Sequence, residues 1–213
     1  MVSNFKTRVV SIKFLSKKNN LFIVSLENGF DYRVHADFVV KYKIKEKSFI
    51  ENKIINKALN QTEQQLIKNK IIVLLSYRLR SKHELIELFQ SKGFHLENIK
   101  NVINDLEKRE YINDYEFAKM YSSHLVKEKK LGRFLVEQKL KQHKIDSEVI
   151  LEIVSKLYKE NPSVIIINEI INKKKHLGGK SEKNKIKLTN YLKRKGFQLE
   201  EIISVLKSNY SKF

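Results

Sequence analysis

The chain of 213 residues contains no cysteine, no tryptophan, a single proline and six glycines. Without cysteine it forms neither disulfide bonds nor thiolate metal sites, which fits a reducing compartment, so we expect a cytoplasmic protein. No run of apolar residues is longer than about five, far short of the roughly 20 that a membrane-spanning helix needs. The N-terminal sequence also lacks the apolar segment of a signal peptide, and we expect no membrane partner.

Acidic residues are scarce. The 24 Asp and Glu residues are outnumbered by 43 Lys and Arg residues, which gives a formal net charge of +19. The excess is uneven, with a net charge of +7 in residues 1–57 and +8 in residues 161–213. Such a charge favours a polyanionic partner, most often nucleic acid. An A/T-rich genome would also produce many lysines without selection for binding, but it would spread them more evenly.

Signatures of catalysis are missing as well. The six histidines show no i, i+3 or i+4 pairing suited to a metal ion, and no nucleophile is spaced to meet a base. The segment Gly179–Ser181 matches the end of a phosphate-binding P-loop, but Lys174 stands where that motif needs its first glycine. We therefore expect no enzyme activity and no cofactor.

What the sequence does contain is a hydrophobic pattern that recurs about every fifty residues. The copies begin at Leu85, at Val136 (51 residues later) and at Leu188 (a further 52). Their internal offsets agree, and the positions are Leu85, Phe89, Phe94, Ile99, Ile103 and Leu106; Val136, Leu140, Ile145, Ile150, Val154 and Leu157; and Leu188, Leu192, Phe197, Ile202 and Leu206. A period of this length is typical of stacked repeat proteins, which offer long binding surfaces.

Capping residues divide each copy into three helices. Ser81 and Glu84 form a capping box, Gly93 supplies a left-handed helix end, and Asp114 and Asp146 can each cap a following helix. Thr62 and Gln65 form another capping box, which predicts a helix beginning there. The fold class that we expect is mainly α, with three tandem three-helix repeats in an elongated curved array. The expected repeats span residues 58–110, 111–160 and 161–213.

Residues 1–57 have a different pattern and predict a small antiparallel β-rich domain. Two β-branched and aromatic runs, Val9–Leu15 and Leu21–Leu26, are followed by the hairpin signal Asn28-Gly29 and a returning strand. Asp37–Tyr42 and Ser48–Ile50 are expected to form short helices that close one face.

Three segments in order resemble the RecX family, the regulatory proteins of the RecA recombinase. They are Leu75–Leu85 with Ser91–Phe94; Tyr111–Ala118; and Lys127–Gly132 with the apolar positions that follow. Two departures occur: Glu110 replaces a glycine that usually precedes the tyrosine, and Arg133 replaces a frequent proline. The first affects a turn. The N-terminal extension is similar to that of Gram-positive members.

The resemblance implies tandem three-helix repeats that lie along the RecA–DNA filament and suppress its ATPase, strand exchange and recombination. The implied partners are the RecA filament and single-stranded or duplex DNA, contacted directly or through RecA. Two alternatives stay open. One is a direct DNA-binding protein of the helix-turn-helix type, although the candidate third helices carry many acids. The other is a scaffold for another protein.

Clusters of basic residues at helix ends are the candidate RecA- or DNA-binding groups. They are Arg78 and Arg80; Lys127, Lys129, Lys130 and Arg133; Lys173, Lys174 and Lys175; and Lys193, Arg194 and Lys195. Cations near helix C-termini and in loops also occur for purely structural reasons, because they complement the helix dipole or stay solvated. The aromatic residues Tyr111, Phe117 and Tyr121 have helical spacing and are expected to pack in a core rather than stack on bases.

Overall fold

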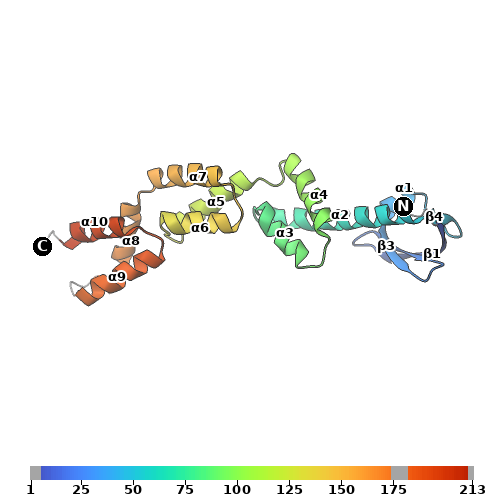
Figure 1. Ribbon diagram of the computed structural model, residues 1–213, viewed down its shortest axis with the longest axis horizontal. Helices are drawn as coiled ribbons and strands as arrows, with labels where there is room; N and C mark the ends of the chain where they lie inside the picture. Colours follow the sequence, from blue (N-terminus) through green and yellow to red (C-terminus); the bar gives the residue numbers. More distant parts are fainter. Residues whose placement is uncertain (1–5, 174–181, 211–213) are drawn as a thin grey trace, which may run out of the picture. The chain divides into compact units, whose positions relative to one another are not determined.

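The computed structural model describes residues 6–173 and 182–210, and within these ranges it is mainly helical with one antiparallel sheet. The chain divides into two compact units (Figure 1). The first unit contains the chain up to residue 78 together with residues 85–112. The second contains residues 79–84 and the chain from residue 113 onward. The mainly α fold preceded by a β-rich segment is as expected, whereas the four-domain division stays a prediction.

The sheet has four described strands in the order β3-β2-β1-β4. They are β1 (Lys6–Ser16), β2 (Leu21–Leu26), β3 (Asp31–His35) and β4 (Phe49–Glu51), and the short helix α1 (Ala36–Lys41) follows β3. The hairpin between β2 and β3 turns at Gly29, whose φ is +83°. The prediction of a helix at 48–50 is wrong, because Phe49 pairs with Arg8 of β1. Phe49 is exposed and Ile50 is buried, which is the two-residue alternation of a strand.

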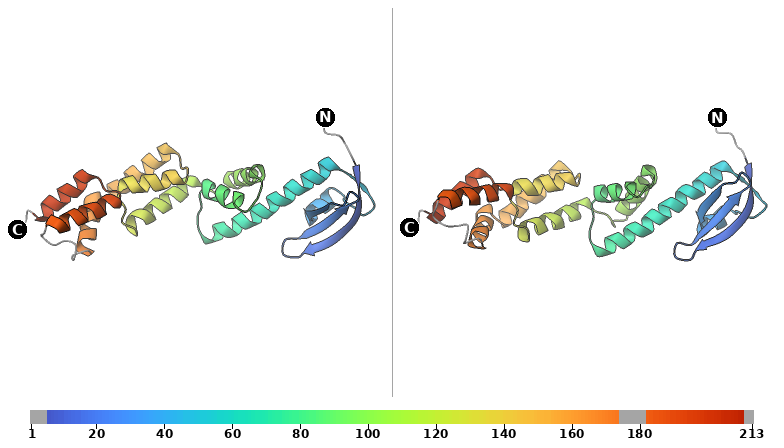
Figure 2. Two further views of the ribbon diagram at one scale, coloured as in Figure 1. Left: turned by 60° about the horizontal axis from the view of Figure 1, so that its bottom comes forward. Right: turned by 90° about the horizontal axis from the view of Figure 1, so that it is seen from below.

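One long helix, α2 (Asn52–Tyr77), connects the sheet to the helices of the first unit. Its first turns contribute Ile55 and Ala58 to the core beneath the sheet, and its later turns contribute Ile67 and Ile71 to a second core. At 26 residues it is about 39 Å long, enough to reach both (Figure 2).

The predicted helix start at Thr62 is wrong. Thr62 is buried in the middle of α2, where its hydroxyl donates to the Ala58 carbonyl at 2.8 Å and accepts the His35 N–H at 2.9 Å. A threonine can bond back to its own helix in this way, so a capping-box pattern alone does not identify a helix start.

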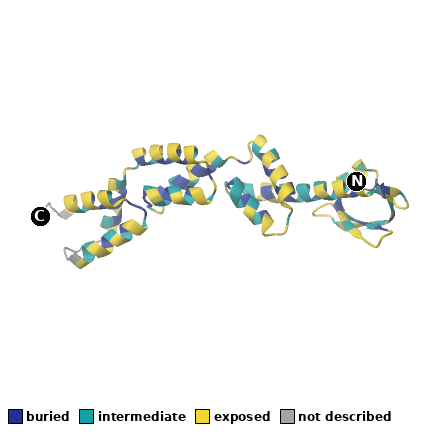
Figure 3. Cartoon of the chain, viewed as in Figure 1, coloured by how far each residue is buried: buried dark blue, intermediate teal, exposed yellow. Residues whose placement is uncertain are grey.

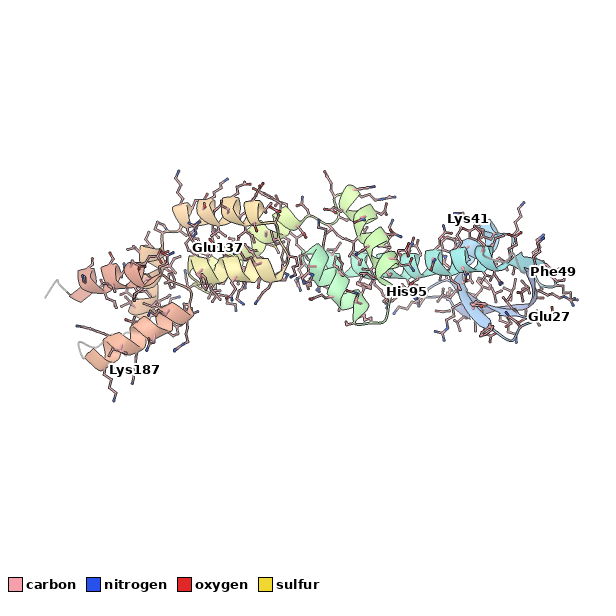
Figure 4. The ribbon with its side chains drawn as sticks, in the orientation of Figure 1. Glu27, Lys41, Phe49, His95, Glu137 and Lys187 are labelled. Carbon is pink, nitrogen blue, oxygen red and sulfur yellow. The ribbon has the colours of Figure 1, made fainter. Side chains whose placement is uncertain are left out.

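The second core of the first unit is formed by α2, α3 (Lys82–Gln90) and α4 (Leu96–Lys108). Glu63 on α2 accepts hydrogen bonds from the His95 N–H and from the Asn98 side chain, and Figure 4 labels His95 just before α4. Burial opposes ionisation of Glu63, but these bonds and the His95 ring together hold the pKa of its carboxyl below the usual value. The first turn of α4 is thereby fastened to α2.

The second unit contains six described helices around one continuous core. They are α5 (Asp114–Lys127), α6 (Arg133–Gln142), α7 (Ser147–Glu160), α8 (Ser163–Lys173), α9 (Glu182–Arg194) and α10 (Leu199–Tyr210). Asp146 caps α7 as expected, since it accepts the Glu148 N–H at 2.8 Å. The cap of α5 is Asn113 rather than Asp114, because Asn113 accepts two N–H groups and Asp114 instead accepts the Lys82 N–H at 2.8 Å.

The repeated hydrophobic positions form the cores, as predicted. All of them are buried except Phe94, Leu157 and Leu206, which are partly buried and packed against the cores. Figure 3 shows the buried residues on the helix faces that turn toward one another inside each unit. Copies two and three contribute to a single cluster, so these two repeats share one core rather than each enclosing its own.

The constant spacing within the repeats has a local cause. In each copy the middle helix ends in a Schellman motif, in which a left-handed residue lets the following N–H bond a carbonyl five residues earlier. Gly93, Lys144 and Gly196 occupy that position with φ of +81°, +55° and +88°. This backbone bond joins the two apolar residues that flank the turn, which are Phe89 and Phe94, Leu140 and Ile145, and Leu192 and Phe197. Two of the recurring hydrophobic offsets are therefore parts of one helix-end motif.

Glu110 ends α4 in the same way, with φ +61° and an N–H···O bond of 2.9 Å from Tyr111 to Leu106. We expect Glu110→Gly and Lys144→Gly each to raise the free energy of unfolding by about 0.5–1 kcal/mol. Glycine removes the steric cost of the left-handed conformation, and part of that gain is offset by the greater freedom of the unfolded chain. Urea denaturation followed by circular dichroism measures both variants.

The matched control is Lys141→Gly, in the last turn of α6, where the backbone is helical. It should lower stability by about 1 kcal/mol. If all three substitutions destabilise the protein, the left-handed residues carry no strain.

Candidate functional site

Two loops of the second unit that are far apart in the sequence lie in direct contact. The Gly132 N–H donates to the Lys195 carbonyl at 2.7 Å, and the Phe134 N–H donates to the Gly196 carbonyl at 3.3 Å. The Lys195 ammonium returns to the Lys129 carbonyl at 2.7 Å. The loop between α5 and α6 is thus hydrogen-bonded to the loop between α9 and α10.

The contact requires two glycines. A Cβ atom on Gly132 would lie 2.4–2.5 Å from backbone atoms of Gly196 and Phe197, and one on Gly196 would lie 2.5 Å from the Cβ of Leu135. Gly132 has an ordinary φ of −81°, so the space around it and not its conformation demands glycine. Gly196 is needed for both reasons.

A buried tyrosine fixes the same loop from within. Leu131, directly before Gly132, is buried, and its carbonyl accepts the Tyr158 hydroxyl at 2.7 Å. Burial raises the pKa of Tyr158 far above its usual value, and the negative charges of Glu201 and Glu137 raise it further. The hydroxyl therefore stays protonated and donates to the loop throughout the physiological pH range.

Two of the candidate cations have structural partners. The Lys130 ammonium lies 2.6 Å from Glu169 on α8, and this bond lowers the pKa of that carboxyl. The Arg133 guanidinium donates to Glu137 on α6 at 2.9 Å, and to Ser155 on α7 at 3.1 Å. Figure 4 labels Glu137 on α6. Lys130 thus joins the loop to α8, and Arg133 joins α6 to α7.

The other candidate cations around the paired loops are exposed, except for Lys195. Lys127 ends α5, Lys129 lies in the following loop, and Lys193 and Arg194 end α9. Lys195 is half-buried, with its ammonium 5.8 Å from the centre of the Tyr191 ring. We call these five residues the basic junction. The structure brings the two sequence clusters together, since Lys195 and Lys129 are bonded directly.

The remaining candidates do not join this group through a described contact. Arg78 is exposed at the end of α2 in the first unit. Arg80 is half-buried and paired with Glu84, while its Nε is buried without a hydrogen-bond partner. Lys173 is exposed at the end of α8, and the predicted sites Lys174 and Lys175 lie outside the described residues.

Comparison with known proteins relates the chain to one group of regulatory proteins. Residues 113–152 match the family model for the second three-helix domain of RecX. Regulatory protein RecX of Staphylococcus aureus strain Newman is 27% identical over 202 residues, which cover 93% of this chain and 73% of that protein, and the protein of strain JH9 matches equally. The chain is therefore similar to RecX proteins over almost its whole length. These relatives are named as regulatory proteins, which agrees with the expectation that the chain is not an enzyme.

Crystal structures of RecX proteins show the same fold. One crystal structure of regulatory protein RecX superposes with a TM-score of 0.68 at 15% identity, over 95% of this chain and 99% of its own. RecX from Lactobacillus salivarius gives a TM-score of 0.57 at 22% identity, over 68% of this chain and 96% of its own. Among the helices in the described ranges, none is long and apolar enough to cross a bilayer.

A polar cluster that the sequence did not indicate lies beside α5. Ser81 caps α3, as predicted, by accepting the Glu84 N–H, and its hydroxyl also lies 3.1 Å from the His143 ring. That ring contacts Phe117 and Tyr121, which pack in the core as expected. Tyr111 does not, because 56% of its surface is exposed. The cluster joins residues 62 positions apart, so no local pattern announces it.

We expect Gly132→Ala to lower the free energy of unfolding by about 3 kcal/mol, because the new methyl group would overlap backbone atoms that have no room to move. The matched control is Gly93→Ala, a left-handed glycine with nothing within 4 Å of the added Cβ. It should cost only about 1 kcal/mol of conformational strain. Urea denaturation of the two variants makes the comparison, and equal losses would show that the loops do not need their close contact.

Proposed function

We propose that this protein is a negative regulator of RecA that binds the RecA–DNA filament in the cytoplasm. Stoichiometric binding would inhibit the ATPase, strand exchange and recombination. Similarity to RecX proteins supports the partner, and the basic junction supports a polyanionic surface on it. The single observation that carries the proposal is the pairing of the loops at Gly132 and Lys195, which holds cations from two repeats side by side.

The mechanism follows from how the cations are held. Binding restricts both the backbone and the side chain of a lysine, and each restriction costs conformational entropy. Here hydrogen bonds between the loops already fix the backbone, so only the side-chain entropy is lost on binding. A cluster of positive charges on a fixed backbone suits carboxylates and DNA phosphates that repeat along a filament. A chain bound across neighbouring RecA subunits would hinder the motions that ATP turnover needs, and at a growing end it would block addition of the next subunit.

The helix-turn-helix alternative fits the structure less well. A helix that reads the major groove of DNA should be free of exposed acids on its outer face. In the third helix of the central repeat, α7, the side chains of Glu148, Glu152 and Glu160 are all exposed. Sequence-specific binding to duplex DNA without RecA, seen in a gel shift, would nevertheless establish it. Capture of a partner protein that nucleic acid does not affect would instead favour a scaffold.

The test adds increasing amounts of this protein to RecA, DNA and ATP. The rate of DNA-dependent ATP hydrolysis should fall until the protein saturates the filament. An unchanged rate at saturation contradicts the proposal. Replacing Lys129, Lys193 and Arg194 together by glutamine should raise the half-inhibiting concentration about tenfold, because exposed charges across an interface steer and hold the partner. Lys130 and Arg133 are left intact, since their removal would strand Glu169 and Glu137.

The control for that variant replaces Lys18, Lys100 and Lys108 by glutamine. These residues are equally exposed, lie in the first unit and remove the same charge. Inhibition should stay within about twofold of the unmodified protein, because the net charge alone is not the determinant. Equal losses in the two variants would mean that the basic junction has no special role.

Salt dependence measures whether DNA phosphates are touched. If the three cations each contact a phosphate of single-stranded DNA, their replacement by glutamine should reduce the slope of log affinity against log salt by about 2, since each contact contributes roughly 0.7. Fluorescence anisotropy of a labelled oligonucleotide gives this slope. An identical slope in the variant would show that these three cations do not contact DNA phosphates.

A further inference from the structure

A groove in the second unit lies between α5 and α7, helices that pack against each other (Figure 1). Its cavity has a volume of about 310 Å³. One wall is a single face of α5 with Tyr115, Lys119, Ser123 and Lys127. At that end of α5 the Tyr115 hydroxyl donates to Glu152 on α7 at 2.7 Å. The two walls of the groove are thus held together by packing between α5 and α7 and by this hydrogen bond.

The base of the groove is apolar. Ile153 is 6% exposed, Leu157 is half-buried, and both belong to the face of α7 that lines the cavity. Ser122, also in the lining, is fully buried, and its hydroxyl is already used by the Lys119 carbonyl at 3.1 Å. A phosphate or other ion placed here would lose water without gaining a buried donor, which is unfavourable. Apolar side chains are the better occupant.

The rim of the groove is positive. Lys119, Lys127 and Lys156 line it, against one acid, Glu160. Lys127 and Lys156 form no ion pair within the part of the chain that the structure describes, and Lys119 lies 3.9 Å from Glu116 in an exposed, weak pair. All three lysines are exposed. An apolar base within a ring of lysines is complementary to a segment that has apolar side chains flanked by carboxylates.

We propose that the α5–α7 groove binds a short acidic segment of a partner protein, which inserts one or two apolar side chains over Ile153 and Leu157 and places carboxylates against Lys119, Lys127 and Lys156. The volume is at the lower end of the range for small-ligand sites, so it accepts side chains rather than a whole element. This site is distinct in chemistry from the basic junction, and it would bind such a segment whether or not RecA supplies it.

The test uses the full chain without RecA and a fluorescent helical peptide of glutamate and leucine, with leucines at i, i+3 and i+7. A second peptide has the same composition with its leucines scattered around the helix. The striped peptide should bind at least about tenfold more tightly. Equal binding of the two peptides would overturn the proposal, because charge alone would then explain the affinity.

The groove variant is Lys119→Glu with Lys156→Glu, and the matched control is Lys141→Glu with Lys159→Glu, two exposed lysines outside the lining. The groove variant should lose about tenfold in affinity for the striped peptide, and the control should stay within about twofold. Circular dichroism verifies that both variants are folded. Equal losses would overturn the assignment.

An oligo-dT strand is measured in parallel with the same variants. Its affinity should change equally in the groove variant and the control, since both lose the same charge. A larger loss in the groove variant would show that the groove binds phosphates and would also overturn the assignment. Because RecA is absent from every arm, these outcomes do not depend on whether this protein inhibits RecA.

Discussion

The second unit depends on a close contact between the backbones of two loops. This contact is possible only because each loop has a glycine there. Gly132 and Gly196 let the loop after α5 and the loop after α9 come close enough to exchange hydrogen bonds. Their contact continues the core that copies two and three share, from Phe117 to Val205. Because the same loops carry Lys129 and Lys195, the packing that stabilises the unit also decides which cations are neighbours. One contact thus determines both the packing of these loops and which lysines lie next to each other.

Much of the helical fold could be predicted because its causes are local. Ser81 and Asp146 cap α3 and α7 as predicted, and Gly93 supplies the left-handed end after α3, since caps and left-handed ends are determined within a few turns. The errors occur where a distant partner decides. Thr62 is a core residue of α2 because His35 needs an acceptor, and Ile50 is in a strand because β1 offers it an edge. Neither partner is visible in the local pattern.

The candidate site was predictable in composition but not in geometry. Clusters of Lys and Arg at helix ends are evident in the sequence, yet the partners that distinguish a structural cation from an exposed one are remote. Glu169 is 39 positions from Lys130, and Ser155 is 22 from Arg133. The two glycines are also 64 positions apart, so their contact cannot be inferred from spacing. The α5–α7 groove could not be predicted from any sequence pattern, because the residues of its apolar base look like ordinary core positions.

The basic junction and the groove meet at Lys127, which ends α5 and belongs to both. A chain with a net charge of +19 repels itself, and that repulsion is greatest where cations are crowded. An anion bound at either site relieves it locally, although two separate anions would then repel each other. This repulsion between the bound anions costs less when both belong to one rigid partner. The free energy needed to bring them together was then spent when that partner formed, before it bound. The arrangement therefore favours one rigid partner that carries both negative groups over the same groups supplied as independent molecules.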